Sequence, residues 1–270
     1  MYAPTMELRG KRVLITGASR GIGESLAHAF AGAGATVALV ARTQDSIRAL
    51  AAELDGTAHP ADLSDPKQLA TLIGHVEHEA GPIDVLVNNA GIGGTVAAFT
   101  DTSDEDLRRV IEVNYLAPAE LCRQAIPRML GHGGGHIVNI SSIAGCSVMP
   151  GMATYSASKA ALSHFTAGLR ADLRGLSIGT TLVELGPIPT DMLAETEGYE
   201  PTAKSFRRFY RTRLIVDVAR EKVADEVVEA VQKGRRHVRI PKRAALLPML
   251  CEAPRRASEL VLTGVPHQVT

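Results

Sequence analysis

The sequence predicts an α/β protein built on a single Rossmann-type, doubly wound parallel sheet with helices on both faces. Short β-branched runs alternate with longer Ala-rich segments, the order of a repeated strand-helix unit. The runs are apolar throughout, as in strands buried on both faces. A chain of 270 residues suits one large α/β domain, so we expect residues 1–270 to share one core.

The alternation gives the expected elements in order. Strands are expected at the runs RVLITG, TVALVA, GTAHPADL, IDVLVNNAG, HIVNISS, GTTLVELG and HVRI. Helices are expected over residues 21–33, 44–54, 66–79, 104–130 and 223–233, and around Tyr155. A C-terminal tail begins at about residue 241 and alternates basic with apolar residues, which allows a membrane-surface helix. Pro248 and Pro254 are expected to divide the tail into short pieces that pack on the body or on a neighbouring subunit.

Composition excludes several classes of function. Lys plus Arg and Asp plus Glu each number 29, and Trp is absent, which argues against a nucleic-acid surface. Cys122, Cys146 and Cys251 show no CxxC or framework spacing, as expected in a reducing compartment. No apolar run has the length of a bilayer span. We therefore expect a cytoplasmic protein with no integral membrane segment and a small-molecule ligand.

Two histidine pairs were weighed as metal ligands. His75 and His78 lie three residues apart on an expected helix, and His132 and His136 flank a glycine-rich stretch. A metal site needs at least a third ligand, and the sequence shows none near either pair. We expect no metal.

The stretch TYSASKAAL places Tyr155 and Lys159 four residues apart, on one face of a helix. A nearby cation favours the phenolate and lowers the pKa of a tyrosine, which suits acid-base catalysis. Alone, the pair is also compatible with a surface lysine beside a half-buried core tyrosine, so the rest of the chain must decide.

The first expected strand runs directly into the turn TGASRGIG and then into a helix. Glycines at such a turn let the backbone approach a pyrophosphate, and the helix N-terminus favours the negative charge. The second strand ends at Arg42 with no adjacent carboxylate, and Arg20 lies in the glycine turn. Two cations where the ribose phosphate would lie predict NADP(H) in preference to NAD(H).

Five motifs together resemble the short-chain dehydrogenase/reductase family, of the NADP-preferring type. They are TGASRGIG, NNAG at residues 88–91, Asn114, ISS ending at Ser142, and YSASK. The resemblance implies an NADP(H)-dependent oxidoreductase that transfers hydride between the nicotinamide and a carbonyl or secondary alcohol. Cys146, Met149 and Met152 suggest an apolar wall and hence an apolar substrate.

The resemblance also implies roles for single residues. Tyr155 would exchange the proton, Lys159 would lower its pKa and bind the nicotinamide ribose, Ser142 would hold the reacting oxygen, and Asn114 would hold a water behind Lys159. Ser141 is the neighbour without a role. The implied cofactor-binding residues are Gly17, Ser19, Arg20, Gly21, Ile22, Gly23, Arg42, Asp62, Leu63, Asn89, Ala90, Gly91, Tyr155, Lys159, Gly186, Ile188 and Thr190.

Within that set, Asp62 and the backbone of Leu63 would bind the adenine, and Thr190 the carboxamide. Asn88 would mainly brace the central strands. Leu185 departs from the pattern, because the family commonly has a proline there.

The family further implies a substrate lid at about 190–215 and a homodimer or homotetramer. Phe206, Phe209 and Tyr210 share one face of a possible helix in this segment, and we expect that face to roof an apolar pocket. The adjoining face carries Lys204, Arg207, Arg208 and Arg211. A solvated surface is the preferred interpretation of these cations; docking of an acidic carrier such as a coenzyme A thioester is the alternative.

Two other functions remain open at this point. One is a non-catalytic NADP-binding regulator on the same fold. The other is a redox-neutral epimerase or dehydratase that oxidises its substrate transiently. Net consumption of cofactor would separate both from simple reduction.

Overall fold

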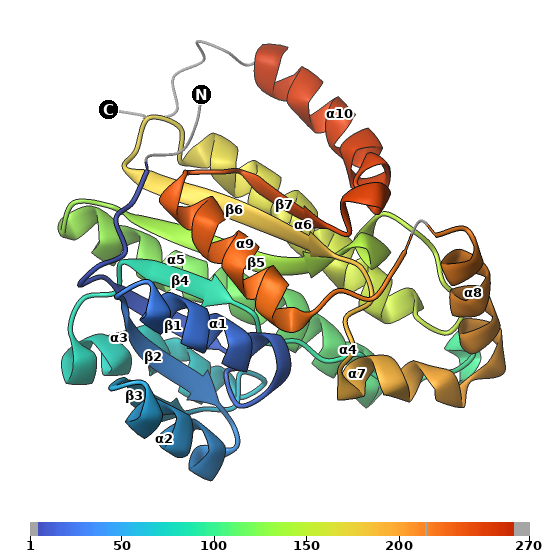
Figure 1. Ribbon diagram of the computed structural model, residues 1–270, viewed down its shortest axis with the longest axis horizontal. Helices are drawn as coiled ribbons and strands as arrows, with labels where there is room; N and C mark the ends of the chain where they lie inside the picture. Colours follow the sequence, from blue (N-terminus) through green and yellow to red (C-terminus); the bar gives the residue numbers. More distant parts are fainter. Residues whose placement is uncertain (1–4, 214, 262–270) are drawn as a thin grey trace.

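Seven parallel strands form one sheet in the order β3-β2-β1-β4-β5-β6-β7 (Figure 1). The computed structural model describes residues 5–213 and 215–261. The strands are β1 (Arg12–Thr16), β2 (Thr36–Ala41), β3 (Thr57–Pro60), β4 (Val85–Asn88), β5 (Gly135–Ser142), β6 (Ile178–Leu185) and β7 (His237–Ile240). The strand order reverses direction between β1 and β4, and this reversal opens a crevice at the carboxyl ends of the strands. The predicted fold class is confirmed.

Helices cover both faces of the sheet. Apolar residues of α1 (Gly21–Gly32), α2 (Gln44–Glu53) and α9 (Arg220–Gln232) share one core cluster with the strands. Those of α3 (Pro66–Ala80) and α5 (Ala117–Gly131) share the other, against which α6 (Ala153–Asp172) also packs. The remaining helices are α4 (Asp104–Ile111), α7 (Asp191–Ala194), α8 (Glu200–Arg211) and α10 (Leu246–Val261), with 3₁₀ turns at Phe99–Asp101, Ile143–Gly145, Glu195–Gly198 and Lys242–Ala244.

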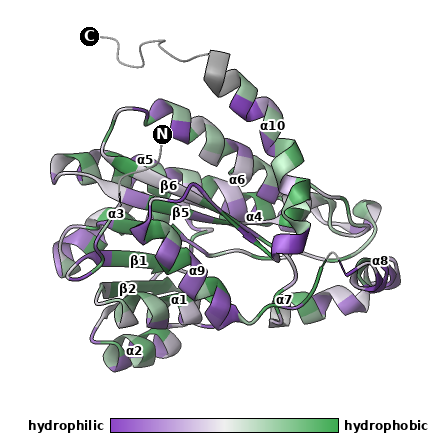
Figure 2. Cartoon of the chain, turned by 45° about the horizontal axis from the view of Figure 1, so that its top comes forward, coloured by the Kyte–Doolittle hydropathy of each residue, from purple (hydrophilic) through white to green (hydrophobic). Residues whose placement is uncertain are grey.

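The apolar strands divide their side chains between the two cores. Val13 and Ile15 of β1 belong to the cluster under α1, whereas Leu14 between them belongs to the cluster under α3. Successive side chains of a strand point to opposite faces, so burial on both sides requires an unbroken apolar run. Figure 2 shows this hydrophobic middle as green strands between helices of mixed colour.

The long helix expected over residues 104–130 is interrupted by a π-helical turn. The turn spans Glu112–Leu116 and separates α4 from α5. Pro118 stands at the start of α5 and has no N–H to donate to the carbonyl of Asn114, four residues earlier. The chain therefore widens its helix at the residue that the sequence singled out.

The expectation of short pieces in the tail is wrong. The helix α10 runs unbroken over Leu246–Val261 beyond the β7 edge of the sheet (Figure 1). Pro248 lies in the first turn, where a backbone N–H has no partner within the helix, and Pro254 is accommodated in the interior. No helix among the described residues is long and apolar enough to cross a bilayer.

Candidate active site

A pocket opens at the carboxyl ends of β5 and β6, where the crevice of the sheet lies. Its volume is about 1150 Å³, including the open mouth. Polar side chains gather at one end, namely Ser142, Tyr155 and Lys159. The opposite wall is apolar and includes Ile143, Met149, Met152, Phe206, Phe209 and Leu247. Lys159 is the one charged residue among the described residues that line the pocket.

Tyr155 and Lys159 lie on one face of α6, as their spacing predicts. Nζ of Lys159 is 5.9 Å from the centre of the Tyr155 ring and donates a hydrogen bond of 3.0 Å to the carbonyl of Ile140. Lys159 is buried, and Tyr155 is half-buried at the pocket wall. Burial lowers the pKa of Lys159 to about 8.

The expected lowering of the tyrosine pKa by Lys159 is not observed. Burial raises the pKa of Tyr155, and its hydrogen bond with Ser142 offsets only part of that rise. The ammonium of Lys159 is directed to the carbonyl of Ile140 and is itself desolvated, so it does not dominate the phenol. In this arrangement the phenol is protonated at neutral pH and is a proton donor.

Ser142 ends β5 and faces the phenol. Its Oγ donates to the carbonyl of Leu185 at 3.1 Å and accepts from the backbone N–H of Ala144 at 3.1 Å. Ser141, one residue earlier on the strand, is buried and bonds the carbonyl of Lys159 and the hydroxyl of Ser163. The strand alternation thus leaves Ser142 for the pocket and gives Ser141 a structural contact, as expected.

Asn114 is fully buried in the π-helical turn and ties three segments together. Its Oδ1 accepts from the N–H of Ile92 at 2.8 Å, while Nδ2 donates to the carbonyl of Ile92 at 2.9 Å and to Oγ of Ser158 at 3.0 Å. A Cβ on Gly91 would lie 3.3 Å from both Oδ1 of Asn114 and Nζ of Lys159. Asn114 and Lys159 therefore stand next to each other, separated by a glycine backbone.

The glycine turn between β1 and α1 is packed too tightly for side chains. Gly17 has φ of 66°, and a Cβ there would lie 2.8 Å from Cα of Ala90. A Cβ on Gly23 would collide with the carbonyl of Gly17, which lets the first turn of α1 approach β1 closely. The turn thus presents bare backbone beside a helix N-terminus, which fits the pyrophosphate of a dinucleotide.

Thr16 joins this turn to the NNAG segment, and the sequence reasoning missed it. Its Oγ1 accepts from the backbone N–H groups of Asn89 and Ala90, both at 3.0 Å. Nδ2 of Asn89 donates to the carbonyl of Thr16 at 2.9 Å. The position of Thr16 as the last residue of β1, before the glycines, was the available signal. Asn88 braces β4 against β5 through Oδ1 of Asn139 at 2.8 Å.

Arg42, Asp62 and Arg20 lie at the adenosine side of the crevice. Arg42 follows β2 and is exposed, as is Arg20 at the N-terminus of α1. Burial raises the pKa of Asp62, but hydrogen bonds from Ser64 and the charges of Arg42 and Arg109 outweigh it, so the net pKa lies below its usual value. The positive field of Arg42 therefore reaches the loop after β3.

The segment after β6 closes the nicotinamide side. Gly186 and Ile188 line the pocket, and Oγ1 of Thr190 donates to the carbonyl of Ile188 at 3.2 Å. Leu185, which stands in place of the family's proline, is buried and accepts the bond from Ser142. Of the other expected cofactor residues, Ile22, Asn89 and Gly91 also line the pocket, Leu63 is buried in the core, and Ser19 is half-buried in the glycine turn.

The other side chains considered from the sequence lie away from this pocket. His75 and His78 are exposed on α3, whereas His136 is buried in β5 with its pKa lowered by burial to about 4. No group of three potential metal ligands occurs among the described residues. Burial raises the pKa of the Cys146 thiol to about 12, and contact with Cys251 adds to the rise. The structure thus brings together two cysteines that are far apart in sequence, both as free thiols.

Comparisons with known proteins agree with this geometry. Residues 11–200 match the short chain dehydrogenase family. The chain is 39% identical over 202 residues to ketoacyl reductase HetN of Nostoc sp., covering 72% of this chain and 69% of HetN. It also resembles a short chain dehydrogenase/reductase of Burkholderia phymatum solved in complex with NAD, with 26% identity, a TM-score of 0.79 and 93% and 96% of the two chains covered.

A short-chain dehydrogenase of Sphingobium yanoikuyae solved in complex with NADPH is 28% identical, with a TM-score of 0.78 and 96% and 98% of the two chains covered. The matched region contains β1 through β6 and every residue of the polar end of the pocket. The chain therefore belongs to the short-chain dehydrogenase/reductase family of NAD(P)-dependent oxidoreductases.

Proposed function

We propose that this protein is an NADP(H)-dependent reductase of neutral, apolar ketones. One observation carries the proposal: Ser142, Tyr155 and Lys159 meet at the polar end of a pocket whose remaining wall is apolar. A carbonyl oxygen would bind at the polar end, and its apolar substituents would occupy the rest of the pocket. The Nostoc relative is named a ketoacyl reductase, a ketone-reducing activity that supports this direction.

The cofactor supplies the hydride, and the chain supplies a proton and orientation. Oγ of Ser142 is placed to donate to the carbonyl oxygen, where negative charge develops. Burial keeps the phenol of Tyr155 protonated, so it holds the proton that the new alcohol needs. The cation of Lys159, one helical turn away, stabilises the phenolate that is left. Asn114 fixes Ile92 and Ser158 and so positions the surroundings of Lys159.

The preference for NADP(H) rests on charge. Arg42 follows β2 and Arg20 begins α1, and both are exposed at the adenosine side of the crevice. The residues on either side of Arg42, Ala41 and Thr43, carry no carboxylate to accept from a free ribose hydroxyl. A 2′-phosphate would be attracted by both guanidinium groups.

The segment over 190–215 is proposed to be a substrate lid on the single domain. Phe206 and Phe209 of α8 contribute to the apolar wall, together with Met192 and Ile215 from the same region. Arg208 and Arg211 on the other side of α8 are exposed to solvent. An apolar substrate buried under this lid would lose its contact with water.

We also propose a cytoplasmic homo-oligomer. The three free cysteines fit a reducing compartment. Leu116 and Leu130 are exposed on the segment that contains α5, one of the helices through which family members pair. Light scattering during size-exclusion chromatography measures the number of subunits directly, and a monomer would contradict the proposal.

The test of the function is initial-rate kinetics with NADPH and with NADH across neutral ketones of increasing apolar size. We expect a higher kcat/KM with NADPH and a rise with apolar size until the pocket is filled. Arg42→Ala should narrow the preference for NADPH, whereas Lys67→Ala, which removes an exposed cation on α3, should leave it unchanged. Binding of NADPH without net consumption for any ketone would favour the regulator or the redox-neutral enzyme instead.

A further inference from the structure

The outer face of α10 carries an exposed apolar stripe. Leu246, Met249 and Leu250 are 64%, 51% and 62% exposed, large fractions for such side chains. Ala253 and Ala257 continue the stripe at the helical spacing and are also exposed. The stripe is therefore a continuous feature of one helix face.

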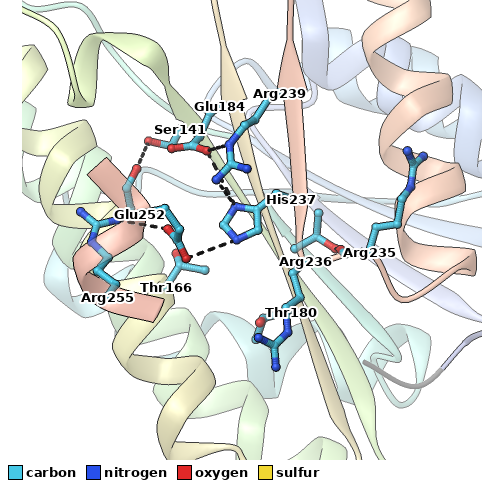
Figure 3. Close-up of polar contacts among 12 residues, drawn as sticks. Ser141, Thr166, Thr180, Glu184, Arg235, Arg236, His237, Arg239, Glu252 and Arg255 are labelled. Carbon is cyan, nitrogen blue, oxygen red and sulfur yellow. Dashed lines mark hydrogen bonds and ion pairs between the residues drawn. The ribbon is translucent and has the colours of Figure 1, made fainter. Parts of the chain in front are cut away.

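A buried ionic cluster holds α10 in this rotation. The carboxylate of Glu252 is 2% exposed and lies 3.4 Å from Nε2 of His237 on β7 and 3.8 Å from Nη1 of Arg170 on α6. Figure 3 shows Glu252 pointing toward His237 and Arg255 beside it. On a helix of 3.6 residues per turn, the side chains of Glu252 and Pro248 lie opposite the stripe. The contact with the body thus faces the apolar residues outward.

Cations flank the stripe. Lys242, Arg243 and Arg256 are exposed, and Lys242 approaches Glu226 of α9 only at 3.7 Å. Over residues 242–257 the one acidic residue is Glu252, which is buried in the cluster described above. The outward surface of this stretch is therefore apolar in the middle and positive at its margins.

The same surface reaches the mouth of the pocket. Leu247, next to the stripe, lines the pocket, and Cys251 contacts Cys146 of the loop that follows β5. That loop contributes Met149 to the pocket wall and carries Val148, which is 86% exposed. The exposed apolar residues and the apolar pocket thus share two segments of the chain.

We propose that the outer face of α10, with Val148, docks on a lipid bilayer that carries anionic headgroups. An amphipathic helix with an apolar stripe and basic margins lies in the plane of such an interface. The cytoplasmic leaflet attracts cations, each worth about 1 kcal/mol near the surface. Two copies of this face meeting each other would set cations against cations, so a second copy is the less suitable occupant. That docking would bring the pocket to apolar ketones dissolved in the bilayer rests on the proposed function; the docking itself does not.

The chain contains no Trp, which permits a clean fluorescent reporter. Leu250→Trp places the one indole on the stripe, and Phe99→Trp places it at a position that is also 62% exposed but lies before α4. With vesicles of phosphatidylcholine plus phosphatidylserine, we expect the emission of Leu250→Trp to shift to shorter wavelength and that of Phe99→Trp to stay constant. An unchanged emission of Leu250→Trp, or an equal shift in both, would overturn the proposal.

Flotation of the protein with vesicles gives an independent readout that needs no catalysis. The triple variant Leu246→Ser, Met249→Ser, Leu250→Ser should lower the partition coefficient roughly tenfold or more, because exposed apolar area is lost. Arg243→Gln with Arg256→Gln should reduce binding to anionic vesicles severalfold, whereas Lys67→Gln with Lys222→Gln should not. A short-wavelength emission of Leu250→Trp that depends on protein concentration without vesicles would show that a second copy covers the face and would refute bilayer docking.

Discussion

Lys159 is the most heavily desolvated charge at the active site. Its ammonium is buried, bonds only one carbonyl in the described structure, and has a pKa lowered from 10.5 to about 8. The unfolded chain binds this proton more tightly than the folded chain does between these two pH values. Stability contributed by the site therefore rises as the pH rises through this window, and the charged lysine weakens the fold at neutral pH.

Replacing this lysine should stabilise the protein and abolish its activity. Lys159→Met should raise the free energy of unfolding at neutral pH by about 1 to 3 kcal/mol, since the desolvation cost disappears while one hydrogen bond is lost. The gain should shrink toward about pH 10, where the wild-type lysine is neutral. Urea unfolding at several pH values measures both effects.

Lys233→Met is the matched control, because Lys233 is exposed on the surface beyond α9. It should change stability by less than about 0.5 kcal/mol and leave turnover intact. A Lys159→Met protein that is less stable than the wild type at neutral pH would show that the ammonium is compensated in the folded state.

The sequence identified the polar residues of the site but not their electrostatics. Tyr155 and Lys159 are neighbours because i and i+4 share a helix face, which is a local rule. The direction of the tyrosine pKa depends on burial and on the carbonyl of Ile140, which comes from β5. Such long-range contacts have no signature in the spacing of two residues.

At the level of elements, the lid helix α8 has two faces with different tasks. Phe206 and Phe209 are half-buried on the pocket side, while Arg207 is exposed and pairs with Glu200 on the same helix at 2.7 Å. The sequence predicted both faces, because amphipathic periodicity is local. Substrate contact is therefore expected from the aromatic face alone.

Removing the aromatic face should affect large substrates selectively. Phe206→Ala with Phe209→Ala should raise KM for bulky ketones roughly tenfold, because buried apolar contact is lost, and should change KM for the smallest ketones little. Initial rates over the ketone series provide the measurement. Equal effects on small and large ketones would mean that α8 does not contact the substrate.

The basic face of α8 supplies the control. Arg207→Ala, Arg208→Ala and Arg211→Ala together should leave KM for neutral ketones unchanged. A marked rise in KM for a coenzyme A thioester in this variant would instead support the acidic-carrier alternative.

Two elements show where prediction from sequence reached its limit. The π-helical turn at Glu112–Leu116 follows from Pro118 but is held by bonds from Asn114 to Ile92 and Ser158. The helix α10 continues through Pro254, which sequence rules treat as a break. Tertiary contacts decided both cases. The strands, in contrast, were predictable because burial on both faces demands apolar runs.

For the molecule as a whole, the cluster around Glu252 joins the last helix to the sheet. Burial raises the pKa of Glu252, but His237, Arg170 and Arg255 together bring it down to about 2. A carboxyl group with a lowered folded-state pKa stabilises the fold above its unfolded value of 4.5, and this stabilisation is lost as the pH falls through about 2. None of these partners is near Glu252 in sequence except Arg255.

Glu252→Gln should destabilise the protein by about 2 kcal/mol at neutral pH, because buried cations lose their carboxylate. The difference from the wild type should narrow as the pH is lowered below about 4. Thermal unfolding followed by circular dichroism across this pH range is the measurement. Glu221→Gln, which removes an exposed carboxylate paired with Arg220, should have an effect below about 0.5 kcal/mol. A pH-independent difference for Glu252→Gln would indicate lost packing in place of lost charge.

The central claim is that the phenol of Tyr155 is the proton donor in an NADPH-dependent reduction. The most direct test compares the wild type with Tyr155→Phe in single-turnover NADPH oxidation and in equilibrium binding of NADPH. The account predicts unchanged NADPH affinity within about a factor of three and a fall in the rate of at least about a hundredfold. A Tyr155→Phe protein that oxidises NADPH at the wild-type rate would contradict the account.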